Sequence, residues 1–199
     1  MFIAIVGFIF FACLAMMVRE GLWSNTITMV NVFISGTVAF GFYAPLTIKV
    51  DEALGGEFTY LLDFLMLWAL FVVTMIVARV LTDRLSTTRL RLKHPIDTIC
   101  GPLMAAFAAW VITSFAVATL HTAPLQKEGL GGKLVHEQIE GKSALASPDL
   151  AWLRFVEQIT TPDAYGGKLL VPFQGGSFAK IYTNHRTKLE KASGLRVSR

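Results

Sequence analysis

Two isolated carboxylates come closest to a chemical site in this sequence of 199 residues. Asp63 and Asp97 each lie in a long apolar run, where an ionisable side chain is a functional candidate because its burial in lipid is costly. The sequence has no Gly-x-Ser-x-Gly elbow, no His-Glu-x-x-His helix and no phosphate-binding loop. We therefore expect no catalytic residues and no enzyme activity.

The cysteines and histidines do not form a recognisable constellation. Cys13 and Cys100 both fall in apolar runs, and their spacing fits neither a metal motif nor a disulfide framework. The four histidines lie in expected loops and in the C-terminal part, so we interpret each as a solvated side chain: His94, His121, His136 and His185. The sequence thus predicts no metal site and no cofactor.

Four apolar runs must position these residues, and they cover approximately residues 1–18, 25–48, 58–79 and 96–120. About 20 helical residues cross a hydrocarbon core of ~30 Å, so the first run is marginal and the others are sufficient. The mean hydropathy is +0.56, and 16% of residues are charged, against about 25% in soluble proteins. We expect an all-α membrane protein with a four-span transmembrane domain over residues 1–122.

The basic residues of the short connectors predict the orientation. The third connector carries five of them, Arg79, Arg84, Arg89, Arg91 and Lys93, and the first carries Arg19. The second connector has only Lys49. The first and third connectors should therefore face the cytoplasm, which leaves the N-terminus and the C-terminal tail on the outer side.

Small and polar residues in the second and fourth runs predict helix packing. Asn31 and Ser35 lie four residues apart on one helix face, with Gly36 beside them. In the fourth run, Gly101, Ala105 and Ala109 recur at intervals of four residues. Such residues favour close helix contact in lipid. Asp63, near the start of the third run, either reaches interfacial water or forms an intramembrane polar site; Asp63 and Asp97 should lie near opposite ends of antiparallel helices.

Asp97 has two predicted roles at the start of the fourth run. It lies at the level of Arg19 and Glu20, so we expect Arg19 to pair with Asp97 and to lock the first turn to the fourth helix. Asp97 also stabilises the N-terminus of the fourth helix through the helix dipole. The two roles are compatible.

The tail, residues 123–199, is predicted to be extramembrane, partly helical and rich in loops. Ser147 as N-cap, Pro148 at the first position and Asp149 in the first turn predict a helix with an apolar face. That helix should lie on the membrane surface or pack on a partner. A second short helix is expected from Phe178 to Lys191. The positive charge is too dilute to predict binding to nucleic acid.

Three short motifs resemble the colicin V production protein (CvpA) family. They are Val18-Arg19-Glu20 after the first run, the Phe42–Leu46 segment with its Tyr-x-Pro-Leu, and Asp97-Thr-Ile-Cys-Gly101 opening the fourth. The similarity covers about residues 1–125 and makes Arg19, Glu20, Asp97 and Gly101 the family-motif residues. The resemblance implies a bacterial inner-membrane protein linked to colicin V production or export and to envelope maintenance. Together with the orientation expected from the basic connectors, this places the N-terminus and the tail on the periplasmic side.

The sequence leaves two functional hypotheses. The first is a non-enzymatic membrane protein that acts through helix contacts, as a homo-oligomer or with other envelope membrane proteins. The alternative is a channel or transport component whose polar path is lined by Asn31, Ser35 and Asp63 on the second and third spans.

Overall fold

The computed structural model describes residues 2–54, 59–86, 96–124, 147–161 and 173–191. Within these ranges every regular element is a helix, which confirms the all-helical class there. The helices are α1 (Phe2–Met17), α2 (Leu22–Ala53), α3 (Thr59–Leu85), α4 (Ile96–Thr119), α5 (Pro148–Thr160) and α6 (Gly175–Lys191).

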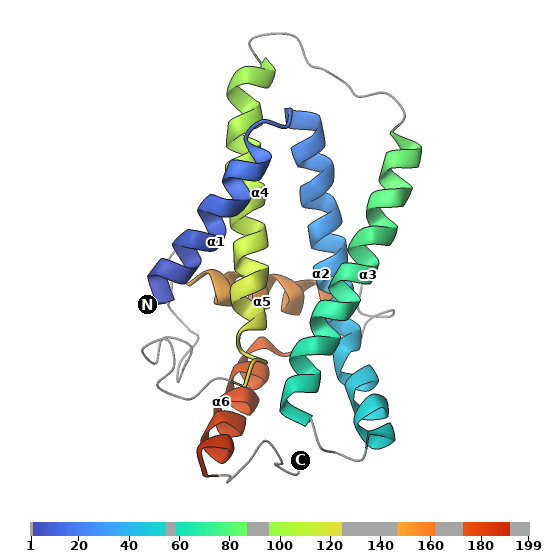
Figure 1. The fold of residues 1–199 in the computed structure, drawn as a ribbon, viewed down its shortest axis with the longest axis vertical. Helices are drawn as coiled ribbons and strands as arrows, with labels where there is room; N and C mark the ends of the chain where they lie inside the picture. Colours follow the sequence, from blue (N-terminus) through green and yellow to red (C-terminus); the bar gives the residue numbers. More distant parts are fainter. Residues whose placement is uncertain (1, 55–58, 87–95, 125–146, 162–172, 192–199) are drawn as a thin grey trace.

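The first four helices form a row with two helices docked on it, and in this row α2 and α4 lie side by side and run in the same direction, while α1 and α3 run the opposite way. Figure 1 shows α2 between α3 and α4, with α1 against the other side of α4. The helix α5 crosses α2 and α4 instead of running along them. The helix α6 lies beyond α5, at the end of the molecule where α3 begins and α4 ends (Figure 1). We call this the α6 end, and the opposite end, where α2 and α4 begin, the elbow end.

Three helices are long and apolar enough to cross a membrane: Leu22–Leu54, Leu61–Leu85 and Asp97–Thr119. Three of the four predicted spans are confirmed by helix length and composition, and these helices identify the chain as a membrane protein. The fourth predicted span, α1, is apolar but has 16 residues. That is about 24 Å of helix, less than the ~30 Å of a typical hydrocarbon core.

The outward faces of these helices are apolar, as a lipid environment requires. Large exposed side chains are spread over α1, α3 and the first half of α4: Ile3, Phe8, Phe11, Met16, Val72, Val73, Ile76, Val77, Val80, Leu81, Ile99, Leu103 and Phe107. The inward side of α4 is instead closely packed. Ala105, Ala108 and Ala109 are fully buried, and the first two form a cluster with Met17 at the end of α1.

Two helices continue beyond the expected spans. The second helix does not end at about residue 48, and it passes Pro45 and continues to Ala53. Tyr43 and Thr47 on either side of Pro45 are buried, so the tertiary packing of this face outweighs the backbone hydrogen bond that proline removes. The third helix continues to Leu85, so Arg79 and Arg84 lie on the helix. The rest of the third connector, residues 87–95, lies outside the described residues.

The tail helices begin close to the expected residues. Helix α5 starts at Pro148 after Ser147, as predicted, although the Ser147 side chain makes no capping hydrogen bond. Helix α6 starts at Gly175, three residues earlier than expected. A side chain at Gly175 would meet Glu157 Oε2 at 3.2 Å and Leu153 Cβ at 3.4 Å, so a glycine there lets α6 begin directly against α5.

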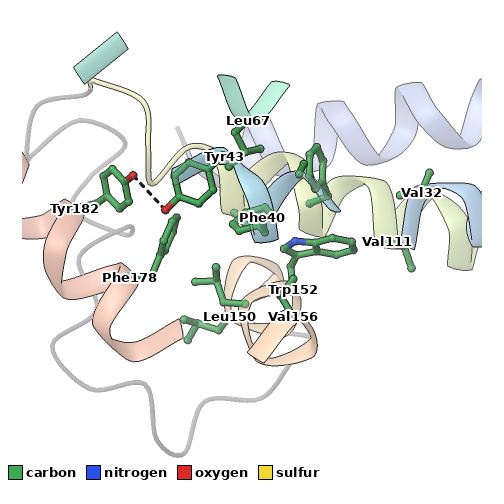
Figure 2. Packing of buried hydrophobic residues seen from close by; sticks show 14 residues of the cluster. Val32, Phe40, Tyr43, Leu67, Val111, Leu150, Trp152, Val156, Phe178 and Tyr182 are labelled. Carbon is green, nitrogen blue, oxygen red and sulfur yellow. Dashed lines mark hydrogen bonds between the residues drawn. The ribbon is translucent and has the colours of Figure 1, made fainter. Parts of the chain in front are cut away.

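An aromatic core joins α5 to the membrane helices (Figure 2). Phe115 of α4 stacks on Phe71 of α3, with ring centroids 4.1 Å apart, and meets Trp152 of α5 edge-on at 5.4 Å. Phe40 of α2 lies against Phe115 and Trp152. Leu150, Trp152, Leu153 and Val156 are all at most 2% exposed. The partner that the amphipathic tail helix packs on is therefore this chain's own α2 and α4.

Candidate functional site

At the elbow end, Asp97 holds the turn that joins α1 to α2. Its Oδ1 accepts a hydrogen bond from the backbone N–H of Leu22, the first residue of α2, at 2.8 Å. A Cβ at Gly21 would lie 3.1 Å from both carboxylate oxygens, so the absence of a side chain leaves room for this approach. Asp97 thus places a negative charge at the N-terminus of α2, where helix dipole and free N–H groups favour it.

Asn25 holds the same turn by hydrogen bonds from its buried side. The side chain is fully buried, and its amide nitrogen lies within hydrogen-bonding distance of three carbonyl oxygens. They belong to Met17 at 3.2 Å, Glu20 at 3.1 Å and Gly101 at 3.3 Å. The amide therefore connects the end of α1, the turn and the first turns of α4. The short motifs at Val18–Glu20 and Asp97–Gly101 come together here although they are far apart in sequence.

The expected pair between Arg19 and Asp97 does not form among the described residues. Arg19 lies in the exposed part of the turn, while the Asp97 carboxylate points at the backbone of α2. Glu20 is also exposed, and its carboxylate accepts a hydrogen bond from the Ser24 hydroxyl at 2.5 Å. Asp97 caps the neighbouring helix because an unpaired helix N–H is a closer and less flexible partner than a long arginine side chain.

Replacing Asp97 with alanine should lower stability by about 1–2 kcal/mol, because the first N–H of α2 loses its acceptor. The Asn variant retains a side-chain oxygen and should lose less. Asp83→Ala is the control, since its carboxylate is 65% exposed and pairs with Arg79 at the surface. Thermal unfolding in detergent would measure the three variants; equal losses for Asp97→Ala and Asp83→Ala would contradict the capping role.

The residues expected to pack helices lie in two different contacts. Asn31 donates to Thr82 Oγ1 at 3.1 Å, and the Ser35 hydroxyl lies 3.8 Å from the Met75 sulfur, so both face α3. Gly36 faces the other way. A Cβ there would lie 2.3 Å from Trp152 Cζ2 and 3.1 Å from Phe115 Cδ2, so α5 and α4 approach the bare backbone of α2.

At the α6 end, Asp63 meets the tail. Its side chain is buried, and Oδ2 accepts a hydrogen bond from the Tyr182 hydroxyl of α6 at 3.0 Å. The hydroxyl oxygens of Tyr182 and Tyr43 lie 3.4 Å apart (Figure 2). Burial raises the pKa of Tyr182 well above its usual value, and the nearby Tyr43 and Asp63 add to the shift. Tyr182 is therefore a neutral donor, and its hydroxyl brings together side chains of α2, α3 and α6.

Tyr182→Phe should weaken the docking of α6 by about 1 kcal/mol, because Asp63 loses a buried donor. The raised pKa adds a pH signature. The unfolded tyrosine ionises near pH 10 and the folded one only above that, so its stabilising contribution is complete below about pH 10 and declines above it. Thermal unfolding from pH 8 to 11 should show this decline in the parent and not in Tyr182→Phe. Thr183→Val is the matched hydroxyl deletion, and parallel pH curves would contradict the assignment.

A second buried polar pair fixes the start of α5. His121 Nε2, just beyond α4, lies 3.0 Å from Asp149 Oδ2 in the first turn of α5. Their side chains are 0% and 2% exposed. The expectation that His121 is solvated is therefore wrong, because α5 covers it. His185 lies with its ring 5.4 Å from that of Tyr182, and His94 and His136 fall outside the described residues.

The arrangement as a whole connects helices. In the part of the chain that the structure describes, no group of three His, Cys, Asp or Glu side chains is placed to hold a metal ion. Asp63 and Asp97 belong to the beginnings of α3 and α4, which lie at opposite ends of the row (Figure 1). The sequence does not predict the contacts of Tyr43, Tyr182 and His121, since only the docking of the tail brings these side chains to their partners.

Comparison with known proteins identifies one family. The family model described as colicin V production protein matches residues 2–141, which include α1 to α4 and the elbow but neither α5 nor α6. No curated protein and no solved structure matches the chain.

Proposed function

The chain belongs to the colicin V production protein family, and from this premise we propose that it is a non-enzymatic protein of the bacterial inner membrane. In this proposal it acts in colicin V production or export, or in envelope maintenance, through contacts between its helices and a partner. The partner is either a second copy of the chain or another envelope membrane protein.

This proposal rests on one observation: the polar side chains of the long helices form hydrogen bonds to neighbouring helices. Asp97 caps α2, Asn31 bonds to α3, and Asp63 accepts from a tail tyrosine. Groups engaged in contacts of this kind position helices, and a positioning role needs no substrate. This supports a scaffold in the membrane rather than an enzyme.

The orientation is part of the proposal. Arg79, Arg84 and the basic residues of segment 87–95 favour the cytoplasm for the elbow end. The α6 end, with both tail helices, then faces the periplasm. In this arrangement α5 and α6 are accessible from the periplasm.

A partner would meet the outward faces rather than the alanine seam. Ala105 and Ala109 are fully buried within the chain, so this seam already serves α1 and α2. Val73 on α3 and Phe107 on α4 remain 58% and 51% exposed. These positions lie where another transmembrane helix can reach.

Photo-crosslinking in native membranes tests the proposal. We expect a photoreactive phenylalanine analogue at Val73 or Phe107 to give a discrete adduct, either a dimer or one partner protein. The same analogue at Phe115, which is 1% exposed, is the control and should give none. The channel alternative makes the opposite prediction: no adduct at either position, together with solute flux through purified protein in liposomes. Flux that depends on Asn31 and Ser35 would overturn the proposal.

A further inference from the structure

Helix α2 is longer than a membrane span requires. Its 32 residues measure about 48 Å, against ~30 Å for a hydrocarbon core. Either the helix tilts strongly or one end of it projects from the bilayer. The position of α5 decides between these possibilities.

Helix α5 crosses α2 at Gly36, where Trp152 contacts the bare backbone. Gly36 lies fourteen residues after Leu22, or about 21 Å along the helix from the elbow end. Helix α1, about 24 Å long, starts at the same level as α5 (Figure 1). The layer between the elbow and α5 is therefore about 21–24 Å deep, somewhat thinner than a typical hydrocarbon core of ~30 Å, and about half of α2 lies beyond it.

The two edges of α5 differ in polarity in the direction expected at a membrane surface. The edge toward the elbow end carries Phe155 and Ile159, and the Phe155 ring lies 4.7 Å from that of Phe33, one turn nearer the elbow than Gly36. The edge toward α6 carries Glu157, whose carboxylate lies beside Gly175. Interfacial helices place their apolar edge against acyl chains and their charged edge in water.

Among the described residues, the buried ionisable side chains lie on α5 or beyond it, away from the elbow. Each is at most 7% exposed: Tyr43, Asp63, His121, Asp149 and Tyr182. A carboxylate costs far less free energy beyond the hydrocarbon than inside it. The α2–α3 hairpin also carries its own charges at this end, Lys49, Asp51 and Glu52.

We infer that α5 is a membrane-surface helix that binds the lipid interface opposite the elbow, with Phe155 and Ile159 toward the acyl chains. The parts of α2 and α3 beyond it form an extramembrane projection clasped by α6. The inference requires membrane insertion, as the proposed function does, but neither the proposed orientation nor the proposed partners.

Two isoleucines of α2 give a matched test. Ile34 and Ile48 are 52% and 48% exposed and lie on opposite sides of the α5 crossing. Each is replaced by cysteine in a full-length chain carrying Cys13→Ser and Cys100→Ser, and sealed vesicles are treated with a membrane-impermeant maleimide. Ile48→Cys should label at least ten-fold faster than Ile34→Cys in one vesicle orientation. Detergent should remove the difference, which shows that both thiols are reactive.

The outcomes separate the two proposals. Equal protection of both cysteines overturns the inference, because the whole of α2 then lies in lipid, while the proposed function survives. Rapid labelling of both without detergent overturns insertion itself and therefore both proposals. The vesicle orientation in which Ile48→Cys reacts reports the topology independently.

A second measurement examines α5 directly. A nitroxide at Ile159 should be more accessible to oxygen, relative to a water-soluble nickel chelate, than one at the exposed Gln158. A bound partner protein in place of lipid would shield Ile159 from both reagents in native membranes, and this result would overturn the lipid assignment.

Discussion

Gly36→Ala should release α5 from the membrane helices and lower stability by about 3 kcal/mol, the upper end of the usual range for overpacking a core. The new Cβ would lie 2.3 Å from Trp152 Cζ2 and 2.6 Å from Cη2. Neither the indole nor Phe115 behind it can yield, because they are 2% and 1% exposed. The measurement is the thermal midpoint in detergent.

Gly7→Ala is the matched control for this substitution. Gly7 also lies in an apolar helix, but nothing comes within 4 Å of a Cβ built there. Alanine at that position should be neutral or stabilising by up to about 1 kcal/mol, because glycine is the weaker helix former. The double variant Gly36→Ala, Trp152→Leu removes the clashing ring atoms and should lose less than the two single losses added. Equal midpoints for Gly36→Ala and Gly7→Ala would refute the close contact.

The sequence predicted what depends on local pattern and chain length. The apolar runs gave α2, α3 and α4, and Ser147-Pro148 gave the start of α5, since each follows from helix length or terminal chemistry within a few residues. The continuation of α2 beyond residue 48 was not predicted, for the complementary reason. Tyr43, near Pro45, is buried in the core and lies against Tyr182 of α6, and such tertiary packing is not contained in the local sequence.

The sites were predictable as residues but not as contacts. Gly36 was expected in a helix interface, yet its neighbour Trp152 lies in the tail helix, which was expected on the membrane surface or on a partner. Asp97 lies in the first turn of α4 as expected, but its hydrogen bond to the first N–H of α2 was not expected. Asp63 gained Tyr182 from 119 residues away. Each miss reflects tertiary docking, since period and capping rules report only on neighbours along the chain.

The second large effect is expected from the buried pair of His121 and Asp149. Asp149→Ala should lower stability by about 3 kcal/mol, because His121 loses a partner while it remains covered by α5. Gln158→Ala on the exposed face of the same helix should change stability by less than about 0.5 kcal/mol. Thermal unfolding in detergent compares the two, and protease release of the tail reports whether α5 has detached.

Asp149→Asn distinguishes the protonation state of the pair. An asparagine oxygen accepts from a neutral imidazole but does not balance an imidazolium, so a neutral His121 predicts a mild loss and a charged one a loss near that of alanine. The double variant His121→Ala, Asp149→Ala completes a cycle whose coupling should be at least about 1 kcal/mol, because the atoms are 3.0 Å apart and water is excluded. Additive losses would mean that each residue holds α5 by packing alone. The pair would then have no part in joining the tail to α4.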